Sequence, residues 1–284
     1  DIFESIELTT NFSFSYHGLN SKKLFLNRNK IVKIFLKQKY KIEFDYNFTE
    51  NKSKIIKIGF GSNFLTRKHS VFKDRHQVIK YLSKLENFKV YVFTFEDFNS
   101  EVKNIYSDCI HIKLTRDVKN NIDLIRKINL DIFTFCEIGM DMIFYYMAFY
   151  KIAKYHFNTW GHSDTSGIKN IDYFISSSFY ENNNSQNNYS EKLILLDSLC
   201  TCYVNPTKNK ILNEELSYYC LFKNQKIILC NQSLFKILPI FDEYIIQILE
   251  NNKDCIIVLL DSVRNLRTNF MKRISRSCKN PTTN

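Results

Sequence analysis

A group of small and hydrogen-bonding residues lies near the middle of the sequence, between Trp160 and Gly167. The run Trp-Gly-His-Ser-Asp-Thr-Ser-Gly contains the only tryptophan of the chain and two of its six glycines. Glycine lets a backbone approach a ligand closely or adopt a positive φ, and hydroxyl and imidazole groups supply hydrogen bonds. The pattern predicts a tight loop that faces a ligand; a purely structural turn is the alternative.

The composition is that of a folded, basic protein. The 284 residues suffice for one large domain or two medium ones, and 44% hydrophobic residues can form real cores. The formal charge of +11 favours either an anionic partner or simply a solvated, lysine-rich surface. Because no zinc-finger spacing, Arg-rich helix or aromatic RNA-binding motif accompanies the charge, nucleic acid is not the expected partner.

The eight cysteines are scattered, and several lie inside apolar runs. Buried free thiols occupy such positions, and no two pairs have zinc-binding spacing. We therefore expect a reducing compartment, the cytoplasm or nucleocytoplasm. The sequence shows neither a signal peptide nor an apolar run of roughly 18 to 20 residues, so no membrane partner is expected.

From residue 54 onward, strand patterns alternate with helix patterns. Strands are predicted at 55–60, 89–95, 109–114, 130–135, 156–160 and 173–176, and helices at 70–85, 117–128 and 141–154. This alternation implies parallel βαβ units, and the fold class is therefore α/β. Upstream, residues 24–40 are compatible with a helix, and alternation in 41–48 favours a strand.

The alternation is interrupted by a polar loop at 181–190 and an irregular stretch at 197–224. It resumes with a strand at 226–230, a helix at 239–250, a strand at 255–260 and a helix at 263–276, followed by a disordered end at 279–284. We divide the chain into an N-terminal extension (1–53), an N-terminal lobe (54–205), a linker (206–224) and a C-terminal lobe (225–284). One strand–helix–strand unit is too small for a stable domain, so this last lobe is expected to be incomplete.

Four segments, in this order and spacing, carry a resemblance to a known family. They are Ile58-Gly-Phe-Gly-Ser-Asn-Phe64 with His69, Ile138-Gly-Met-Asp141, Thr159-Trp-Gly-His-x-Asp-Thr-Ser-Gly-Ile168, and Cys230-Asn-Gln-Ser-Leu-Phe-Lys-Ile-x-Pro239. Together they resemble the catalytic region of the SPINDLY-type and O-linked N-acetylglucosamine transferases. The match covers about residues 54 to 262.

The resemblance implies a GT-B-like fold, in which two Rossmann-like lobes face a cleft. It implies transfer of a sugar from a nucleotide sugar, UDP-N-acetylglucosamine or GDP-fucose, to Ser or Thr of intracellular proteins. Neither a cofactor nor a catalytic metal is implied. The expected partners are thus the nucleotide sugar and a protein acceptor.

The same resemblance assigns roles to particular residues. A nucleoside diphosphate leaving group needs positive charge, which a lysine and a helix N-terminus can supply. Lys236, just before the helix that begins near Pro239, is the implied diphosphate contact, with Gln232 beside it. His69 is the implied active-site histidine, which orients the acceptor hydroxyl or binds a phosphate; an exposed loop histidine is the alternative. The remaining implied donor-binding residues are His162, Thr165, Ser166 and Gly167.

The sequence starts at Asp1 and stops before the Gly-rich donor segment that the resemblance leads one to expect. We therefore expect either a fragment of a longer enzyme or a degenerate, non-catalytic relative that acts as a binding module. A basic nucleic-acid-binding α/β protein is the remaining alternative.

Overall fold

Two compact units make up the protein in its computed structural model, which describes residues 12–66, 69–205, 226–260 and 266–277. Unit 1 comprises Asp1–Ser15 and Asn20–Asn205, and unit 2 comprises Tyr16–Leu19 and Pro206–Asn284. The linker expected at 206–224 and the disordered end expected at 279–284 lie outside the described residues.

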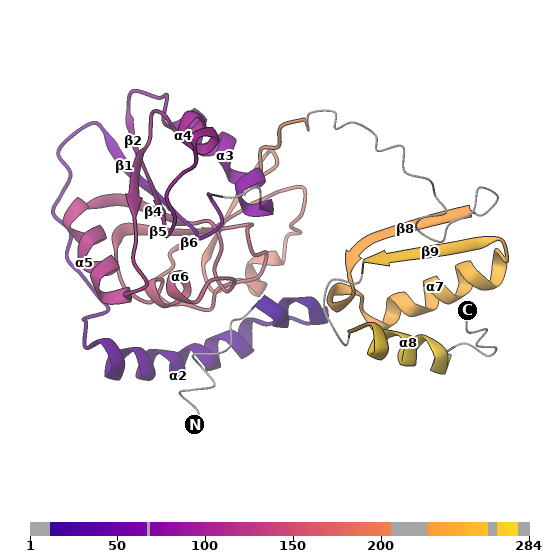
Figure 1. Cartoon of the computed structure of the whole chain (residues 1–284). Coiled ribbons are helices and arrows are strands. Elements are labelled where there is room, and N and C mark those ends of the chain that lie inside the picture. Colours follow the sequence, from indigo (N-terminus) through magenta and orange to yellow (C-terminus); the bar gives the residue numbers. More distant parts are fainter. Residues whose placement is uncertain (1–11, 67–68, 206–225, 261–265, 278–284) are drawn as a thin grey trace. The chain divides into compact units, whose positions relative to one another are not determined.

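Unit 1 is built on a seven-stranded, fully parallel sheet with the order β3-β2-β1-β4-β5-β6-β7 (Figure 1). The strands are β1 (Ile56–Gly61), β2 (Phe88–Thr94), β3 (Ile110–Lys113), β4 (Leu130–Phe135), β5 (Ala153–Thr159), β6 (Tyr173–Ser177) and β7 (Lys192–Leu196). The central strands are rich in apolar residues on both faces, as expected for strands that are covered by helices on both sides. The sheet confirms the predicted α/β class.

Helices cover both faces of this sheet. They are η1 (Phe12–His17), α2 (Lys22–Tyr40), α3 (Ser70–Leu82), α4 (Ser100–Ile105), α5 (Val118–Ile128), α6 (Met142–Met147) and η2 (Ser185–Asn188). One core joins the sheet to α2, α5 and α6, and a second core joins it to α3 and α4 (Figure 1). Such a doubly wound sheet places all βα loops along one edge.

The starts of four helices are fixed by side chains that follow the strands. His69, Asn99, Asp117 and Asp141 accept hydrogen bonds from the first N–H groups of α3, α4, α5 and α6. Each cap satisfies a donor that the helix cannot satisfy internally. The caps therefore explain why each helix begins where its βα loop ends.

Unit 2 is a smaller α/β unit with parallel strands β8 (Lys226–Ser233) and β9 (Cys255–Leu260). Its helices are η4 (Leu234–Lys236), α7 (Pro239–Asn251) and α8 (Leu266–Ser277). Its core contains Leu234, Ile237, Ile245 and Phe270. No helix among the described residues is both long enough and apolar enough to cross a membrane.

Several predicted elements need correction. The helix expected at 141–154 ends at Met147, and β5 already begins at Ala153. Nearly every side chain from 144 to 153 is buried, so the sequence has no polar face to mark the end of the helix. The strand expected at 41–48 does not form, because the Phe44 and Glu43 carbonyls accept hydrogen bonds from Lys151 N and the Arg126 guanidinium instead. The short elements α4 and β7 were not predicted.

Candidate functional site

The βα loops of unit 1 converge at the carboxyl edge of the sheet. β1 lies between β2 and β4, and the chain proceeds outward from β1 in opposite directions on its two sides. Ligands of open α/β sheets bind at such a reversal of strand order. A ligand site of unit 1 is therefore expected at the loops that follow β1, β4 and β5.

Gly161 brings two of these loops into direct contact. A Cβ atom at this position would lie 1.9 Å from the Cys136 carbonyl oxygen and 2.9 Å from Cβ of Glu137. Only glycine permits this approach. The Trp160–Gly167 loop is thus packed against the end of β4, and the Trp160 indole fixes its start by donating to Ser176 Oγ (3.1 Å).

Glu137 is the most deeply buried acid at this edge. It is fully buried and accepts a hydrogen bond from Ser62 Oγ (3.1 Å), which follows β1. Its other oxygen has no hydrogen-bond partner among the described residues. Burial, reinforced by the nearby Asp141 carboxylate, raises the pKa of Glu137 well above its usual value. Burial thus disfavours the charged form of this carboxyl group, which joins β1 to β4 at the reversal point through Ser62.

His69 lies at the same edge and has one ring nitrogen committed to the fold. Its Nδ1 accepts from Val71 N (3.3 Å), and the ring stacks on Phe64 at 4.4 Å. Burial lowers the pKa of His69, so the ring is neutral near pH 7. Because Nδ1 accepts, Nε2 carries the proton and can donate to a substrate oxygen. This geometry suits His69 to donate a hydrogen bond to an anion or a hydroxyl group rather than to act as a general base.

His162 is buried and engaged by the segment around η1. Ser15 Oγ lies 3.0 Å from His162 Nε2 and also donates to Asp164 Oδ2 (3.0 Å). The Phe12 ring packs against the imidazole, with centroids 5.7 Å apart. Burial lowers the pKa of His162 despite the opposing Asp164 carboxylate. In this conformation the side chain is covered by residues far away in the sequence.

The polar groups of Thr165 and Ser166 are bound by one buried carboxylate. Glu191 accepts from Thr165 Oγ1 (2.6 Å), Ser166 N (2.8 Å), Ser166 Oγ and Ser190 Oγ (3.0 Å). Gly167 has a φ of +66°, and a Cβ there would lie 2.8 Å from Phe25 Cβ. This half of the loop is therefore held rigidly against α2 and the start of β7.

The remaining predicted site residues belong to unit 2, at the end of β8. Lys236 Nζ lies 4.9 Å from the centre of the Tyr16 ring and 5.7 Å from that of Phe235, and no acidic partner is found among the described residues. Gln232 is exposed, and its Oε1 accepts from Ser233 N (3.0 Å). Both residues immediately precede α7.

The N-terminus of α7 is open. Leu238 occupies the N-cap without a side-chain hydrogen bond, and Pro239 begins the helix. The one acid in the first turn, Asp242, is bound by the Arg273 guanidinium, which also donates to the Ile237 carbonyl (3.0 Å). Arg273 thereby neutralises a charge that would otherwise repel an anion at this helix end.

The structure groups His162, Thr165, Ser166 and Gly167 in one loop of unit 1, with His69 at the same edge, and groups Lys236 with Gln232 in unit 2. Glu137 and Glu191 were not predicted as site residues, although Glu137 lies two residues after the strand predicted at 130–135 and Glu191 directly follows the polar loop at 181–190. Among the described residues, no cluster of His, Cys, Asp and Glu side chains is arranged to hold a metal ion, and the described cysteines are free thiols.

Comparisons with known proteins find similarity in structure but not in sequence. No protein-family model matches the chain, and no curated protein matches it. A mutant O-GlcNAc transferase from Thermobaculum terrenum superposes with a TM-score of 0.66 at 15% identity, covering 86% of this chain and 48% of its own. The fold is of the GT-B type. The chain spans about half the length of that GT-B structure.

Two further solved structures align less well. A glycosyltransferase from Rickettsia africae gives a TM-score of 0.41 at 14% identity and covers 78% of this chain and 65% of its own. The S. aureus MnaA–UDP structure gives 0.40 at 11% identity, with coverage of 80% and 68%. Alignments with TM-scores this low do not assign roles to individual residues of this chain.

Proposed function

We propose that this chain forms the catalytic region of a glycosyltransferase that moves a sugar from a nucleotide sugar to Ser or Thr of a protein. The proposed donor is UDP-N-acetylglucosamine or GDP-fucose. Two observations support this: the GT-B fold, and the start of α7 after β8 in unit 2, which has no side-chain cap.

The uncapped start of α7 is the observation that carries the proposal. The first N–H groups of a helix have no internal acceptor, and the helix dipole adds partial positive charge there. Lys236 adds a full charge just before this helix, and Arg273 compensates Asp242. A diphosphate leaving group develops negative charge as the sugar departs, and fixed donors of this kind stabilise it without a metal ion. Gln232 is a further donor beside the same junction.

In unit 1, we propose different roles for the two kinds of polar residue. His69 donates from Nε2 to a substrate oxygen, either of the acceptor or of a phosphate. His162, Thr165, Ser166 and Gly167 keep their proposed place in the substrate-facing loop. Their side chains are buried, so they act mainly by holding the loop backbone in position, through Glu191 and Ser15.

Calorimetric titration of the 284-residue chain with UDP and with GDP tests the diphosphate site. We expect one nucleotide to bind and Lys236→Ala to weaken it about tenfold, because a hydrogen bond to a charged group contributes roughly 1.5–3 kcal/mol. Lys253→Ala, another exposed lysine of unit 2, is the matched control and should change little. Binding of neither nucleotide, or equal loss in both variants, would contradict the proposal.

Sugar transfer separates the catalytic proposal from the main alternative, a non-catalytic binding module. Incubation with labelled donor and a mixture of Ser- and Thr-containing peptides should label the peptides in the wild type and less in His69→Ala. Nucleotide binding without any transfer would instead identify a non-catalytic relative.

A further inference from the structure

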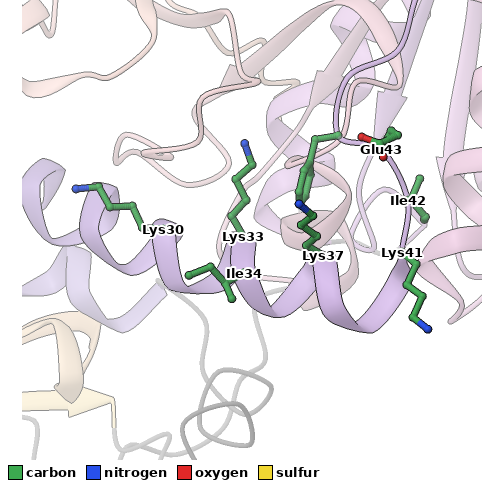
Figure 2. A pocket seen from close by; sticks show the side chains of 8 residues that line it. Lys30, Lys33, Ile34, Lys37, Lys41, Ile42 and Glu43 are labelled. Carbon is green, nitrogen blue, oxygen red and sulfur yellow. The ribbon is translucent and has the colours of Figure 1, made fainter.

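A groove with a lysine rim lies along the second half of α2 in unit 1, and none of the proposed site residues lines it. It has a volume of about 640 Å³ and is lined by Lys30, Lys33, Ile34, Lys37, Lys41, Ile42, Glu43 and Phe44. Figure 2 shows the lysines projecting from successive turns of the helix. Ile42 and Phe44 come from the segment that follows α2.

The four rim lysines outnumber the one acid that lines the groove, Glu43. α2 contains no acidic residue, so none of its lysines has an intrahelical ion pair. Elsewhere lysines are paired with acids, as in Lys151–Asp172 (2.6 Å) and Lys154–Asp131 (2.9 Å). Among the described residues, no ion pair involves the four rim lysines.

Helix stability explains only part of the rim. Lysines in the last turn of a helix interact favourably with its dipole, which accounts for Lys37. The effect falls off within a turn, and Lys30 and Lys33 lie further back along the helix. Neither the helix dipole nor an ion pair therefore accounts for Lys30 and Lys33, whose contacts are with Asn27 and the Phe44 ring.

The floor of the groove is apolar but offers no free aromatic face. Phe44 stacks on Tyr150 at 4.8 Å, and Lys33 Nζ lies over its ring, 4.8 Å from the centroid. A single-stranded nucleic acid stacks its bases on exposed rings, which this groove lacks. Glu43 at one end would also repel a continuous row of phosphates. Of the apolar residues that line the groove, Ile34 is exposed, whereas Ile42 and Phe44 are only partly exposed, so a membrane would meet a single exposed apolar side chain among the lysines.

We propose that this groove binds an acidic peptide segment of a partner protein, with carboxylates on the lysine rim and an apolar side chain on the floor. From Lys30 to Lys41 the helix rises about 16 Å, which matches about five residues of extended peptide. Because none of the proposed nucleotide-binding residues lines the groove, we expect it to recruit a partner whether or not sugar transfer occurs.

Fluorescence anisotropy with a short fluorescein-labelled peptide of Asp and Glu around one Phe tests this proposal. The charge-reversed variant Lys33→Glu/Lys37→Glu should raise its Kd about tenfold or more, because like charges then face each other. The matched variant Lys84→Glu/Lys127→Glu makes the same change in net charge at exposed lysines outside the groove and should shift Kd less than about twofold. Replacing the Phe of the probe by Ala should weaken binding to the wild type.

Circular dichroism and Trp160 fluorescence verify that each variant is folded. Equal weakening of peptide binding in the two double variants would mean that net charge alone causes the effect, and it would overturn the proposal. Binding of oligothymidylate or of phosphatidylserine-containing vesicles, lost in the groove variant, with no binding of the acidic peptide, would overturn it in favour of nucleic acid or membrane.

Discussion

The Trp160–Gly167 loop of unit 1 and the β8–α7 junction of unit 2 both carry residues proposed to handle the donor, yet they use their polar groups in opposite ways. In the loop, Thr165 and Ser166 are bound to Glu191, and His162 contacts Ser15. At the junction, the helix start has no side-chain cap and Lys236 has no acidic partner among the described residues.

Pairing makes the Trp160–Gly167 loop rigid, whereas the unpaired donors of the β8–α7 junction remain available to a ligand. Polar groups that are paired inside the protein hold a loop in place but cannot also bind a substrate without breaking those bonds. Unpaired donors at a helix end cost stability and remain ready for an anion. The loop should therefore be sensitive to substitution in stability, and the junction in binding.

The largest effect is expected for Gly161→Ala in the loop. The added methyl group would lie 1.9 Å from the Cys136 carbonyl oxygen, so the loop or the end of β4 must move. We expect unit 1 to lose about 4 kcal/mol or more of unfolding free energy. Urea unfolding followed by the fluorescence of Trp160, the only tryptophan, measures this change.

Ser163→Ala is the control for that substitution. Ser163 is exposed in the same loop, and its change should stay within about 0.5 kcal/mol. If Gly161→Ala lowered the unfolding free energy no more than Ser163→Ala does, the loop would be flexible. It would then not differ from the junction in rigidity.

Glu191→Ala should produce the next largest effect. It removes one acceptor group from four donors and leaves the N–H of Ser166 buried without a partner, while the hydroxyl of Thr165 keeps only its hydrogen bonds with Ser190. We expect a loss of about 3 kcal/mol in the same urea experiment. Glu191→Gln keeps one carbonyl oxygen as an acceptor, so its unfolding free energy should lie between that of the wild type and that of Glu191→Ala. Wild-type stability in Glu191→Ala would mean that the hydroxyls find other partners and are less committed than the structure shows.

Strands and helices that follow from local sequence patterns could be predicted from the sequence. Hydrogen bonds between residues far apart in the sequence could not. The alternation of strand and helix patterns revealed the α/β fold, since strands such as β1 and β4 are mostly apolar. Glu191 and Glu137 could not be singled out from the sequence, because the partners Ser166 and Ser62 lie 25 and 75 residues away. The segment at 41–48 alternates like a strand, but Arg126 and Lys151 bind its carbonyls. Only the folded chain shows which polar residues are already paired.

The smallest stability effect is expected at the junction, for Lys236→Ala. Its Nζ lies over two rings and has no ion pair among the described residues, so the truncation should change local opening by less than about 0.5 kcal/mol. Hydrogen–deuterium exchange of the α7 amides measures this, with Lys253→Ala as reference. An unchanged α7 makes any loss of nucleotide binding in Lys236→Ala a direct loss of positive charge. Markedly faster exchange would show that Lys236 supports the fold of unit 2, and the junction would then resemble the loop.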